Sequence, residues 1–200
     1  MQEYSRHDWQ ANGEARHIGV ELTGRGLGSG QDMVIENVYV PAGGDVADRE
    51  VNPKFGQKLD FLSRMTDWAG SIKRPTLIVG DFNIAPENVD IGIGDVNAKR
   101  WLRTGKCSFL PEEREWFKRL VDWGLSDTYR KLYPEIYDQY SWFDYRSRGF
   151  EDTPKRGLRI DAIMPTKPLM QKCLDTGIDL DIRGMEKPSD HAPVWAKFDL

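Results

Sequence analysis

The sequence predicts an α/β protein whose sheets combine parallel and antiparallel strands. Two neighbouring segments, 16–23 and 33–40, read as strands joined by a glycine-rich stretch, as in a hairpin. A short, continuously apolar segment at 76–79 has the composition of a buried strand, and segments with helical spacing lie on either side of it. Helices that alternate with strands are typical of α/β proteins, and the hairpin makes the sheet mixed.

The apolar residues of each segment define its type. The first predicted strand alternates in its apolar side chains, which are Ile18, Val20 and Leu22. The glycine-rich stretch 24–31 is expected to be a flexible turn into the second strand. Segment 55–68 is expected to be a helix because its apolar residues recur at helical spacing. These residues are Phe55, Leu59, Leu62 and Met65.

The second half of the chain continues the alternation of helices and strands. Segment 90–105 is expected to be a loop with short helical turns. A helix is expected over 111–122, because Pro111 suits a first helical turn and acidic residues follow it. Segments 158–164 and 194–198 are predicted to be further strands.

The composition fits one globular domain over residues 1–200. The chain is long enough for a sizeable core, with 39% hydrophobic and 30% charged residues. No uncharged stretch could span a bilayer, and residues 1–8 lack the apolar segment of a secretory signal. Cys107 and Cys173 lack the spacing of a zinc site or disulfide framework, so we expect a cytoplasmic protein without a membrane partner.

The charge is distributed unevenly along the chain. A net charge of −4 counts mildly against a nucleic-acid binder. One stretch, 146–159, is nevertheless rich in basic residues and contains Arg146, Arg148, Lys155, Arg156 and Arg159. A metal-dependent nuclease needs this combination, because carboxylates hold the cation and arginines hold the phosphates.

Asp81 and Asn83 directly follow the predicted buried strand, in the segment Gly80-Asp81-Phe82-Asn83. Residues two apart in an extended chain point the same way, and strand ends of open α/β proteins tend to bind ligands. A carboxylate beside an amide suits the binding of a hard cation or the activation of a water. An ordinary turn with helix capping explains the pair as well, so both interpretations stay open.

Asp190 and His191 lie just before the last predicted strand. An imidazole titrates near neutral pH, and a carboxylate on its second nitrogen would fix its tautomer. Asp161, which shares a strand face with Arg159, is a candidate for that carboxylate. A surface turn would explain the Asp–His pair equally, and a cross-strand ion pair would explain Arg159 and Asp161.

Aromatic residues at two places are further candidates. Tyr39 ends the second predicted strand, where its hydroxyl could bind a phosphate or its ring could pack against the core. Segment 140–146 places aromatic residues beside an arginine, which suits stacking on an exposed base or sugar and gripping a nucleic-acid backbone. A core aromatic cluster is the alternative for this segment.

Five segments in this order resemble the exonuclease III/AP-endonuclease branch of the endonuclease–exonuclease–phosphatase superfamily. They are NVYVP (37–41), GDFN (80–83), YSWFDYR (140–146), GLRID (157–161) and SDHAPV (189–194). GDFN and SDH recur across the superfamily, whereas the aromatic and basic segment is more particular to the DNA-repair branch. The resemblance covers the chain from about residue 16 onwards and implies a deoxyribonuclease I-like fold, a two-layer mixed β-sandwich flanked by helices.

The resemblance also implies roles in phosphodiester hydrolysis. Tyr39 would contact the scissile phosphate, and Asn83 would bind the same phosphate. Asp81 would orient or deprotonate the attacking water. His191 would stabilise the charge that grows on the phosphate, with Asp161 as its orienting carboxylate.

The implied function is that of a Mg²⁺-dependent DNA phosphodiesterase of base-excision repair, both a 3′→5′ exonuclease and an abasic-site endonuclease. Asp190 would help to hold Mg²⁺, or Mn²⁺ in its place. The partners would be double-stranded DNA and abasic-site DNA, with Trp142 and 158–160 enclosing a flipped abasic sugar. The expected DNA-binding residues are Trp142, Tyr145, Arg146, Arg148, Leu158, Arg159 and Ile160.

The opening motifs of the resembled family have no counterpart here. Family members begin with a strand ending in Trp-Asn, followed by a Gln-Glu motif whose glutamate is a main metal ligand. Glu3 has no apolar strand before it and is not taken as that ligand. We therefore expect the first strands and helix of the family domain to be missing, metal affinity and turnover to fall, and uncovered core to be exposed or buried by self-association.

Other functions stay open from the sequence. Another phosphoesterase of the superfamily, of the phosphoinositide phosphatase or sphingomyelinase type, would share the GDFN-like and SDH-like motifs but not the aromatic and basic segment. A DNA-binding fragment without turnover would fit the missing glutamate. An incomplete piece of a longer protein would fit it as well.

Overall fold

The structure is a computed structural model that describes residues 4–9, 12–24 and 32–200. Its larger sheet has five strands, and among these strands only β3 and β4 are parallel neighbours. The strand order across the sheet is β1 (Tyr4–Ser5), β2 (His17–Leu22), β3 (Met33–Tyr39), β4 (Thr76–Asp81) and β5 (Asp161–Pro165). The predicted α/β class with mixed pairing is therefore confirmed.

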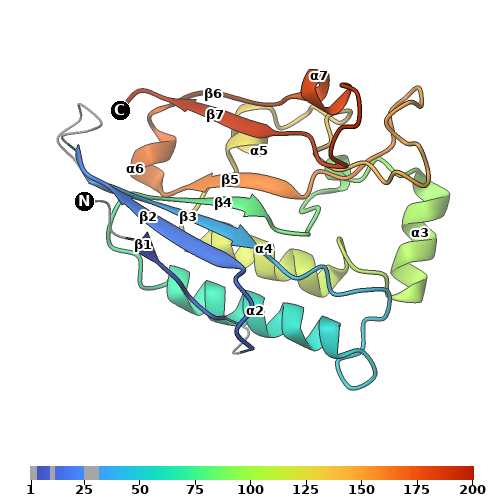
Figure 1. Ribbon diagram of the computed structural model, residues 1–200, viewed down its shortest axis with the longest axis horizontal. Coiled ribbons are helices and arrows are strands. Elements are labelled where there is room, and N and C mark those ends of the chain that lie inside the picture. Colours follow the sequence, from blue (N-terminus) through green and yellow to red (C-terminus); the bar gives the residue numbers. More distant parts are fainter. Residues whose placement is uncertain (1–3, 10–11, 25–31) are drawn as a thin grey trace.

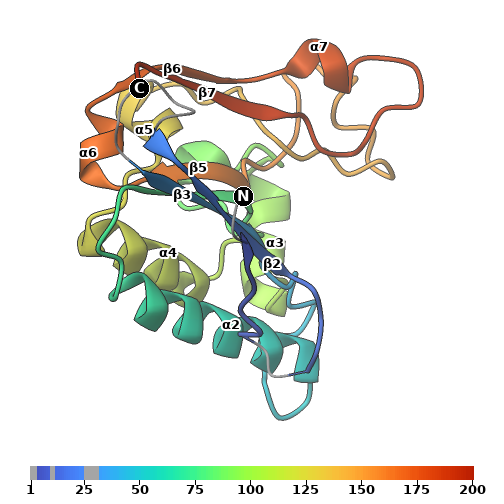
Figure 2. The ribbon, with the colours of Figure 1, turned by 60° about the vertical axis from the view of Figure 1, so that its left-hand side comes forward.

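A second, smaller sheet forms another layer of the molecule. It consists of the antiparallel strands β6 (Cys173–Ile178) and β7 (Val194–Phe198). Figures 1 and 2 show this sheet on one side of the five-stranded sheet and the long helices α2 (Pro53–Ala69) and α4 (Pro111–Trp123) on the other side. The layers are thus helices, a mixed sheet and a second sheet, as the resemblance implies.

Shorter helices connect these layers. They are η1 (Asn88–Asp90), α3 (Asp95–Thr104), α5 (Thr128–Leu132), α6 (Lys167–Met170) and α7 (Leu180–Arg183). Figure 1 shows α3 at the edge of the molecule, beyond the ends of β3 and β4. Among the described residues, no helix combines the length and the apolar composition that crossing a bilayer requires.

The two long helices form where the sequence predicts them. The side chain of Asn52 accepts a hydrogen bond from the N–H of Lys54 at 3.2 Å, and Pro53 opens α2 with a fixed φ angle. Pro111 opens α4 in the same way, and the chain turns away at Gly124, where φ is +123°. The expected hairpin of β2 and β3 is also confirmed.

Two element predictions need correction. Segment 90–105 contains the ten-residue helix α3, of which every residue is described and none is buried, so a pattern of core-facing residues could not reveal it. The strand predicted at 158–164 begins only at Asp161, because Leu158 pairs with Trp142 instead of continuing β5. Most of the predicted turn at 24–31 lies outside the described residues.

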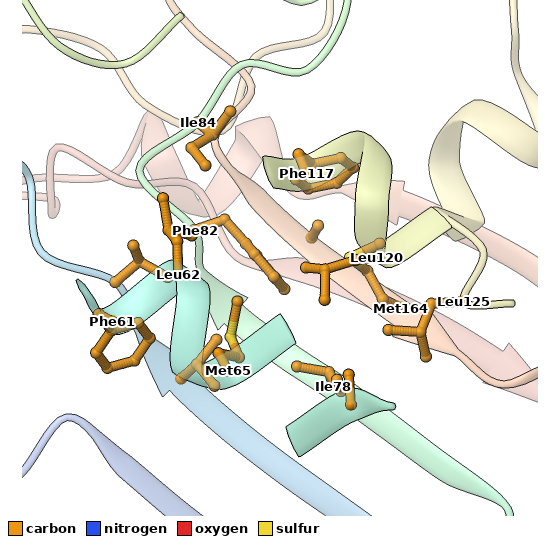
Figure 3. Close-up of a cluster of buried hydrophobic side chains, with 14 of the residues drawn as sticks. Phe61, Leu62, Met65, Ile78, Phe82, Ile84, Phe117, Leu120, Leu125 and Met164 are labelled. Carbon is orange, nitrogen blue, oxygen red and sulfur yellow. The ribbon is translucent and has the colours of Figure 1, made fainter. Parts of the chain in front are cut away.

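The main core lies between the long helices and the five-stranded sheet. Figure 3 shows Phe61, Leu62 and Met65 of α2 facing the sheet, beside side chains of α4. Met65 and Leu62 are fully buried. This packing fixes α2 and α4 against the sheet and so holds the loops at the ends of β3 and β4.

We expect Met65→Ala to destabilise the protein by about 2–5 kcal/mol, because it leaves a cavity in the main core. Urea unfolding would measure the loss. Arg64→Ala, at the exposed position next to it, is the control and should stay within about 0.5 kcal/mol of the parent protein. Equal stability of the two variants would contradict this account of the core.

Candidate active site

At one edge of the large sheet, β3 and β4 end beside the start of β5, and each of the three strands contributes a polar residue there. Tyr39 is the register partner of Asp81 in the parallel pair β3–β4, and Asp81 is the partner of Asp161 in the antiparallel pair β4–β5. Gly80 precedes Asp81 with φ +130°, and a Cβ atom there would lie 2.0 Å from the carbonyl oxygen of Val38. A glycine is therefore required immediately before Asp81.

His191 joins this group through a hydrogen bond to Asp161. Its Nδ1 lies 2.9 Å from Asp161 Oδ2, and its side chain is about one third exposed, at 32%. The backbone at Trp142 bridges to both Leu158 and His191, which explains how segments far apart in sequence meet here. One ligand atom each from Asp81, Asp161 and His191 lies within 4.8 Å of the others.

Asn83 holds the carboxylate of Asp81. Its backbone N–H donates to Asp81 Oδ1 at 2.7 Å, and its side-chain Nδ2 donates to Asp81 Oδ2 at 3.0 Å and to the carbonyl of Val40 at 2.8 Å. Both hydrogens of the amide are thus engaged, and Asn83 could donate to a phosphate only by exchanging one partner. The turn interpretation of this segment is therefore correct, and the same turn orients the carboxylate of Asp81.

The surroundings of Asp81 make its carboxyl group less acidic. Burial raises the pKa of Asp81 to about 7, and the charge of Asp161 adds to the rise. The charge of His191, the N–H of Asn83 and the charge of Lys58 act in the opposite direction. At neutral pH Asp81 is therefore close to its midpoint, where a carboxyl group exchanges protons readily with water.

The pKa of His191 moves upward. Burial alone would lower it, but the hydrogen bond and charge of Asp161 outweigh burial, and the charges of Asp81 and Asp190 add to the rise. The imidazole is therefore more readily cationic than a free histidine. A cation at this position would stabilise negative charge on a bound phosphate.

The donor atoms at this edge of the sheet fit a hard divalent cation. Asp81 and Asp161 offer carboxylate oxygens, and their mutual repulsion is a force that a bound cation would remove. Asp190, the expected metal ligand, lies outside the group of three. Its Oδ2 instead accepts a hydrogen bond from the indole Nε1 of Trp142 at 3.0 Å.

Tyr39 lies at the rim of the site. Its side chain is 53% exposed, and the guanidinium of Arg16 stacks over the ring at 4.9 Å from its centre. The alternative of a ring packed into the core is therefore wrong for Tyr39. Tyr39 thus presents an exposed side chain at the strand end next to the one that carries Asp81.

The expected DNA-binding residues differ in exposure. Leu158 and Ile160 are buried in a cluster against which the half-buried Trp142 packs, so Trp142 offers the accessible surface of the three. Arg146 and Arg148 are exposed on the loop that follows. This loop therefore presents a mixed aromatic and basic surface next to His191.

Arg159 lies in a different place from the one expected. It is 1% exposed, and its guanidinium binds Asp90 and Asp127 at N–O distances of 2.6 Å each. The two carboxylates occupy the donors that a DNA phosphate would need. The prediction that Arg159 contacts DNA is therefore wrong, and its role is to join three loops inside the protein.

A buried arginine that was not among the predicted site residues packs against Tyr145. Arg183 of α7 is 5% exposed and lies 4.7–5.5 Å from the ring centres of Phe143, Tyr145 and Phe150. Tyr145 itself is 54% exposed, and its hydroxyl donates to the carbonyl of Pro188. The aromatic loop and the segment before His191 are thus held together.

Sequence reasoning also missed Ser141 and Lys58. The hydroxyl of Ser141 is fully buried and accepts the N–H groups of Ile160 and Asp161 at 3.0 and 3.1 Å, which fixes the start of β5. Lys58 lies on the apolar face of α2, three residues after Phe55. A charged residue on an apolar helix face is unusual, so the sequence pattern could have identified Lys58. Ser141 gave no such signal.

Comparison with known sequences confirms the expected family. The sequence model of the Endonuclease/Exonuclease/phosphatase family matches residues 36–191. Exodeoxyribonuclease III of Haemophilus influenzae is 54% identical over 169 residues, which are 83% of this chain and 61% of that protein. The chain thus spans about three fifths of the length of this relative.

Solved structures confirm the expected fold. An AP endonuclease from Archaeoglobus fulgidus has a TM-score of 0.82 and 30% identity, covering 100% of this chain and 72% of that one. A 3′ phosphatase from Neisseria, solved with a product DNA hairpin, has a TM-score of 0.81 and 31% identity, covering 100% and 70%. The resemblance to the exonuclease III/AP-endonuclease branch is therefore confirmed, and so is the deoxyribonuclease I-like architecture.

We expect Asp81→Asn to change how stability depends on pH. The pKa of Asp81 is raised to about 7 in the folded protein, so its contribution to stability is present at acidic pH and is lost as pH rises through 7. The variant should therefore gain about 1 kcal/mol relative to the parent protein between pH 6 and pH 8, as measured by urea unfolding without divalent cations. Asp122→Asn, on the exposed face of α4, is the control. Parallel curves for Asp81→Asn and the parent would show that Asp81 has an ordinary pKa.

Proposed function

We propose that the chain, which belongs to the Endonuclease/Exonuclease/phosphatase family, is a Mg²⁺-dependent DNA phosphodiesterase, acting as a 3′→5′ exonuclease and an abasic-site endonuclease in DNA base-excision repair. The observation that carries the proposal is the meeting of Asp81, Asp161 and His191 at one edge of the sheet. The names of the similar proteins, an exodeoxyribonuclease III and an AP endonuclease, support the DNA branch of the family. We also propose that residues 1–200 form a single domain of this family.

In this proposal Asp81 acts on the attacking water. A base is most effective when its pKa lies near the working pH; burial raises the pKa of Asp81 to about 7, and a cation bound beside it would lower that value. The two donors of Asn83 fix the direction of the carboxylate, so that Asp81 receives the proton in one geometry. A divalent cation held at the carboxylates would neutralise phosphate charge and assist the leaving oxygen.

His191 provides positive charge opposite the reacting phosphate. Asp161 accepts from Nδ1, which leaves Nε2 as the nitrogen that can donate to a phosphate oxygen. Ser141 holds the backbone of Asp161 and so fixes the imidazole indirectly. Tyr39, at the neighbouring strand end, would donate its hydroxyl to the same phosphate.

The aromatic and basic loop would hold the DNA. Trp142 would lie against an abasic sugar, with Leu158 and Ile160 as the apolar floor beneath the indole. Arg146 and Arg148 would bind backbone phosphates from the exposed side of the loop, next to Tyr145. We propose Mg²⁺ as the metal, with Mn²⁺ as the alternative, and Asp190 as an additional ligand that would first have to leave Trp142.

The cytoplasm is the proposed location. Cys107 and Cys173 are free thiols, as is usual for proteins of a reducing compartment. Cys107 is buried, and burial raises the pKa of its thiol to about 12, so it is chemically inert.

A duplex oligonucleotide with one abasic site tests the proposal. We expect incision with Mg²⁺ and none with a chelator. Asp81→Asn and His191→Gln should each lower the incision rate by about 100-fold. The first variant removes the general base, and the second removes the positive charge of the imidazole. Asp122→Asn, which alters only an exposed ion pair, should incise like the parent protein.

The other outcomes separate the competing functions. Hydrolysis of a soluble phosphomonoester without incision of abasic DNA would favour another phosphoesterase of the family. DNA binding without cleavage would show a scaffold that lacks turnover. Incision that survives Asp81→Asn would mean that the reaction does not use this site.

Self-association is a separate proposal. Leu174 of β6 and Trp195 of β7 are 58% and 43% exposed on the small sheet, which would favour a partner that covers them. Sedimentation should show a dimer or larger species that Trp195→Glu dissociates. A parent protein that sediments as a monomer and binds no dye for apolar surface would refute the proposal.

A further inference from the structure

Lys58 of α2 is a fully buried cation that contacts the loops after β3 and β4. Its side chain and that of Glu113 are both 0% exposed, and they form an ion pair between α2 and α4. A buried ammonium group is costly unless all its hydrogens find acceptors. Lys58 is completely paired in this way, since two backbone carbonyls accept its remaining hydrogens.

The two carbonyls belong to the loops at the ends of β3 and β4. Lys58 Nζ donates to the carbonyl of Asn83 at 2.9 Å and approaches that of Ala42 at 3.4 Å. These loops follow the strand ends that carry Tyr39 and Asp81. One side chain from α2 therefore ties together the two segments on which the site is built.

The contact with Asn83 matters because Asn83 is conformationally unusual. Its φ is +50°, a left-handed conformation that few residues with a side chain adopt, asparagine being one of them. In this conformation its N–H and its amide reach the two oxygens of Asp81. A bond on the carbonyl of Asn83 thus stabilises the conformation on which the orientation of Asp81 depends.

Glu113 fixes the position of Lys58 from the other side. Its second oxygen accepts the N–H groups of Ser108 and Leu110 at 2.9 and 2.8 Å, at the start of α4. The carboxylate is therefore held by backbone donors and cannot follow Lys58 if that residue moves. The pair has one arrangement, which is what a positioning element requires.

We propose that Lys58, held by Glu113, is a positioning residue of the active site that acts on Asp81 through Asn83. This inference rests on the proposed function for its kinetic part, whereas its structural part does not. A pair that only stabilised the fold would predict a general loss of stability when it is removed. A positioning pair predicts a local change at Asn83 and a loss of turnover.

Lys58→Met combined with Glu113→Gln separates these roles, because it removes both charges while the glutamine oxygen can still accept the N–H groups of Ser108 and Leu110. NMR measures the hydrogen-exchange rate of the backbone N–H of Asn83. The reference is the backbone N–H of Ile78 in the core of β4, whose exchange reports global opening. We expect the ratio of the Asn83 rate to the Ile78 rate to rise at least about tenfold, since Asn83 loses its anchor. An unchanged ratio would overturn the proposal.

Two controls isolate the contact of Lys58 with Asn83. Glu113→Gln alone keeps the ammonium but removes the charge that holds it, so the exchange ratio should rise clearly less than in the double variant. His17→Gln with Glu36→Gln removes another buried pair, which contacts neither Asn83 nor Asp81, and should leave the ratio unchanged. A rise in either control equal to that of the double variant would overturn the assignment to Lys58.

A measurement on the parent protein covers the case in which the double variant does not fold. A buried, fully bonded ammonium group should give a slowly exchanging NMR signal for Lys58 with a coupling across the hydrogen bond to the carbonyl carbon of Asn83. A Lys58 signal that exchanges as fast as those of exposed lysines would overturn the proposal.

Kinetics on abasic-site DNA completes the test. The double variant should lower kcat about tenfold and leave KM within about twofold, because Lys58 does not touch the substrate. A change in KM alone would overturn the positioning role. If the parent protein itself does not turn over, the proposed function fails, while the exchange ratio at Asn83 still decides the structural part.

Discussion

The arrangement of the site depends on two carboxylates that face each other across neighbouring strands. Asp81 and Asp161 are register partners at the end of β4 and the start of β5, and both are partly withdrawn from water. Burial is the largest cause of the raised pKa of Asp81, and repulsion by Asp161 adds to it, because like charges so close cannot both ionise at low cost. A proton on Asp81, the cationic His191 or a divalent cation relieves the repulsion between the two carboxylates. The same repulsion therefore favours both proton binding and cation binding at this site.

Buried ion pairs keep the carboxylates in place. Lys58 and Glu113 support the loop after β4 from the side of the helices. Arg159, bound to Asp90 and Asp127, fixes the segment that leads into β5 from the other side. Breaking such pairs exposes an uncompensated charge in the interior, so these residues specify loop positions that packing alone would leave free.

Local pattern was sufficient to predict most of the elements. The spacing of apolar residues located β2 and α2, a continuous apolar run located β4, and Pro111 with the acidic residues after it located α4. The strand β3 was located as the second strand of the hairpin. Local pattern could not locate α3, since none of its residues is buried, nor β6, whose segment was given no prediction. Elements without a clear apolar pattern therefore cannot be located from the sequence.

The site shows the same division. Asp81, Asp161 and His191 stood out because they follow or precede strands in recognised segments, and the fold does bring them together. Arg159 was misjudged because its partners lie 69 and 32 residues away along the chain. Only tertiary structure shows whether a basic side chain points to solvent or to a buried carboxylate.

The central claim is that the edge of the sheet at Asp81 is a divalent-cation site. Substoichiometric Mn²⁺, a paramagnetic substitute for Mg²⁺, tests it by broadening the NMR signals of nuclei close to the bound ion. The account predicts that the signals of the backbone N–H of Asn83 and of the His191 ring broaden first, and that Asp81→Asn weakens this broadening. Broadening that begins at exposed carboxylates such as Asp122 and spares Asn83 would contradict it.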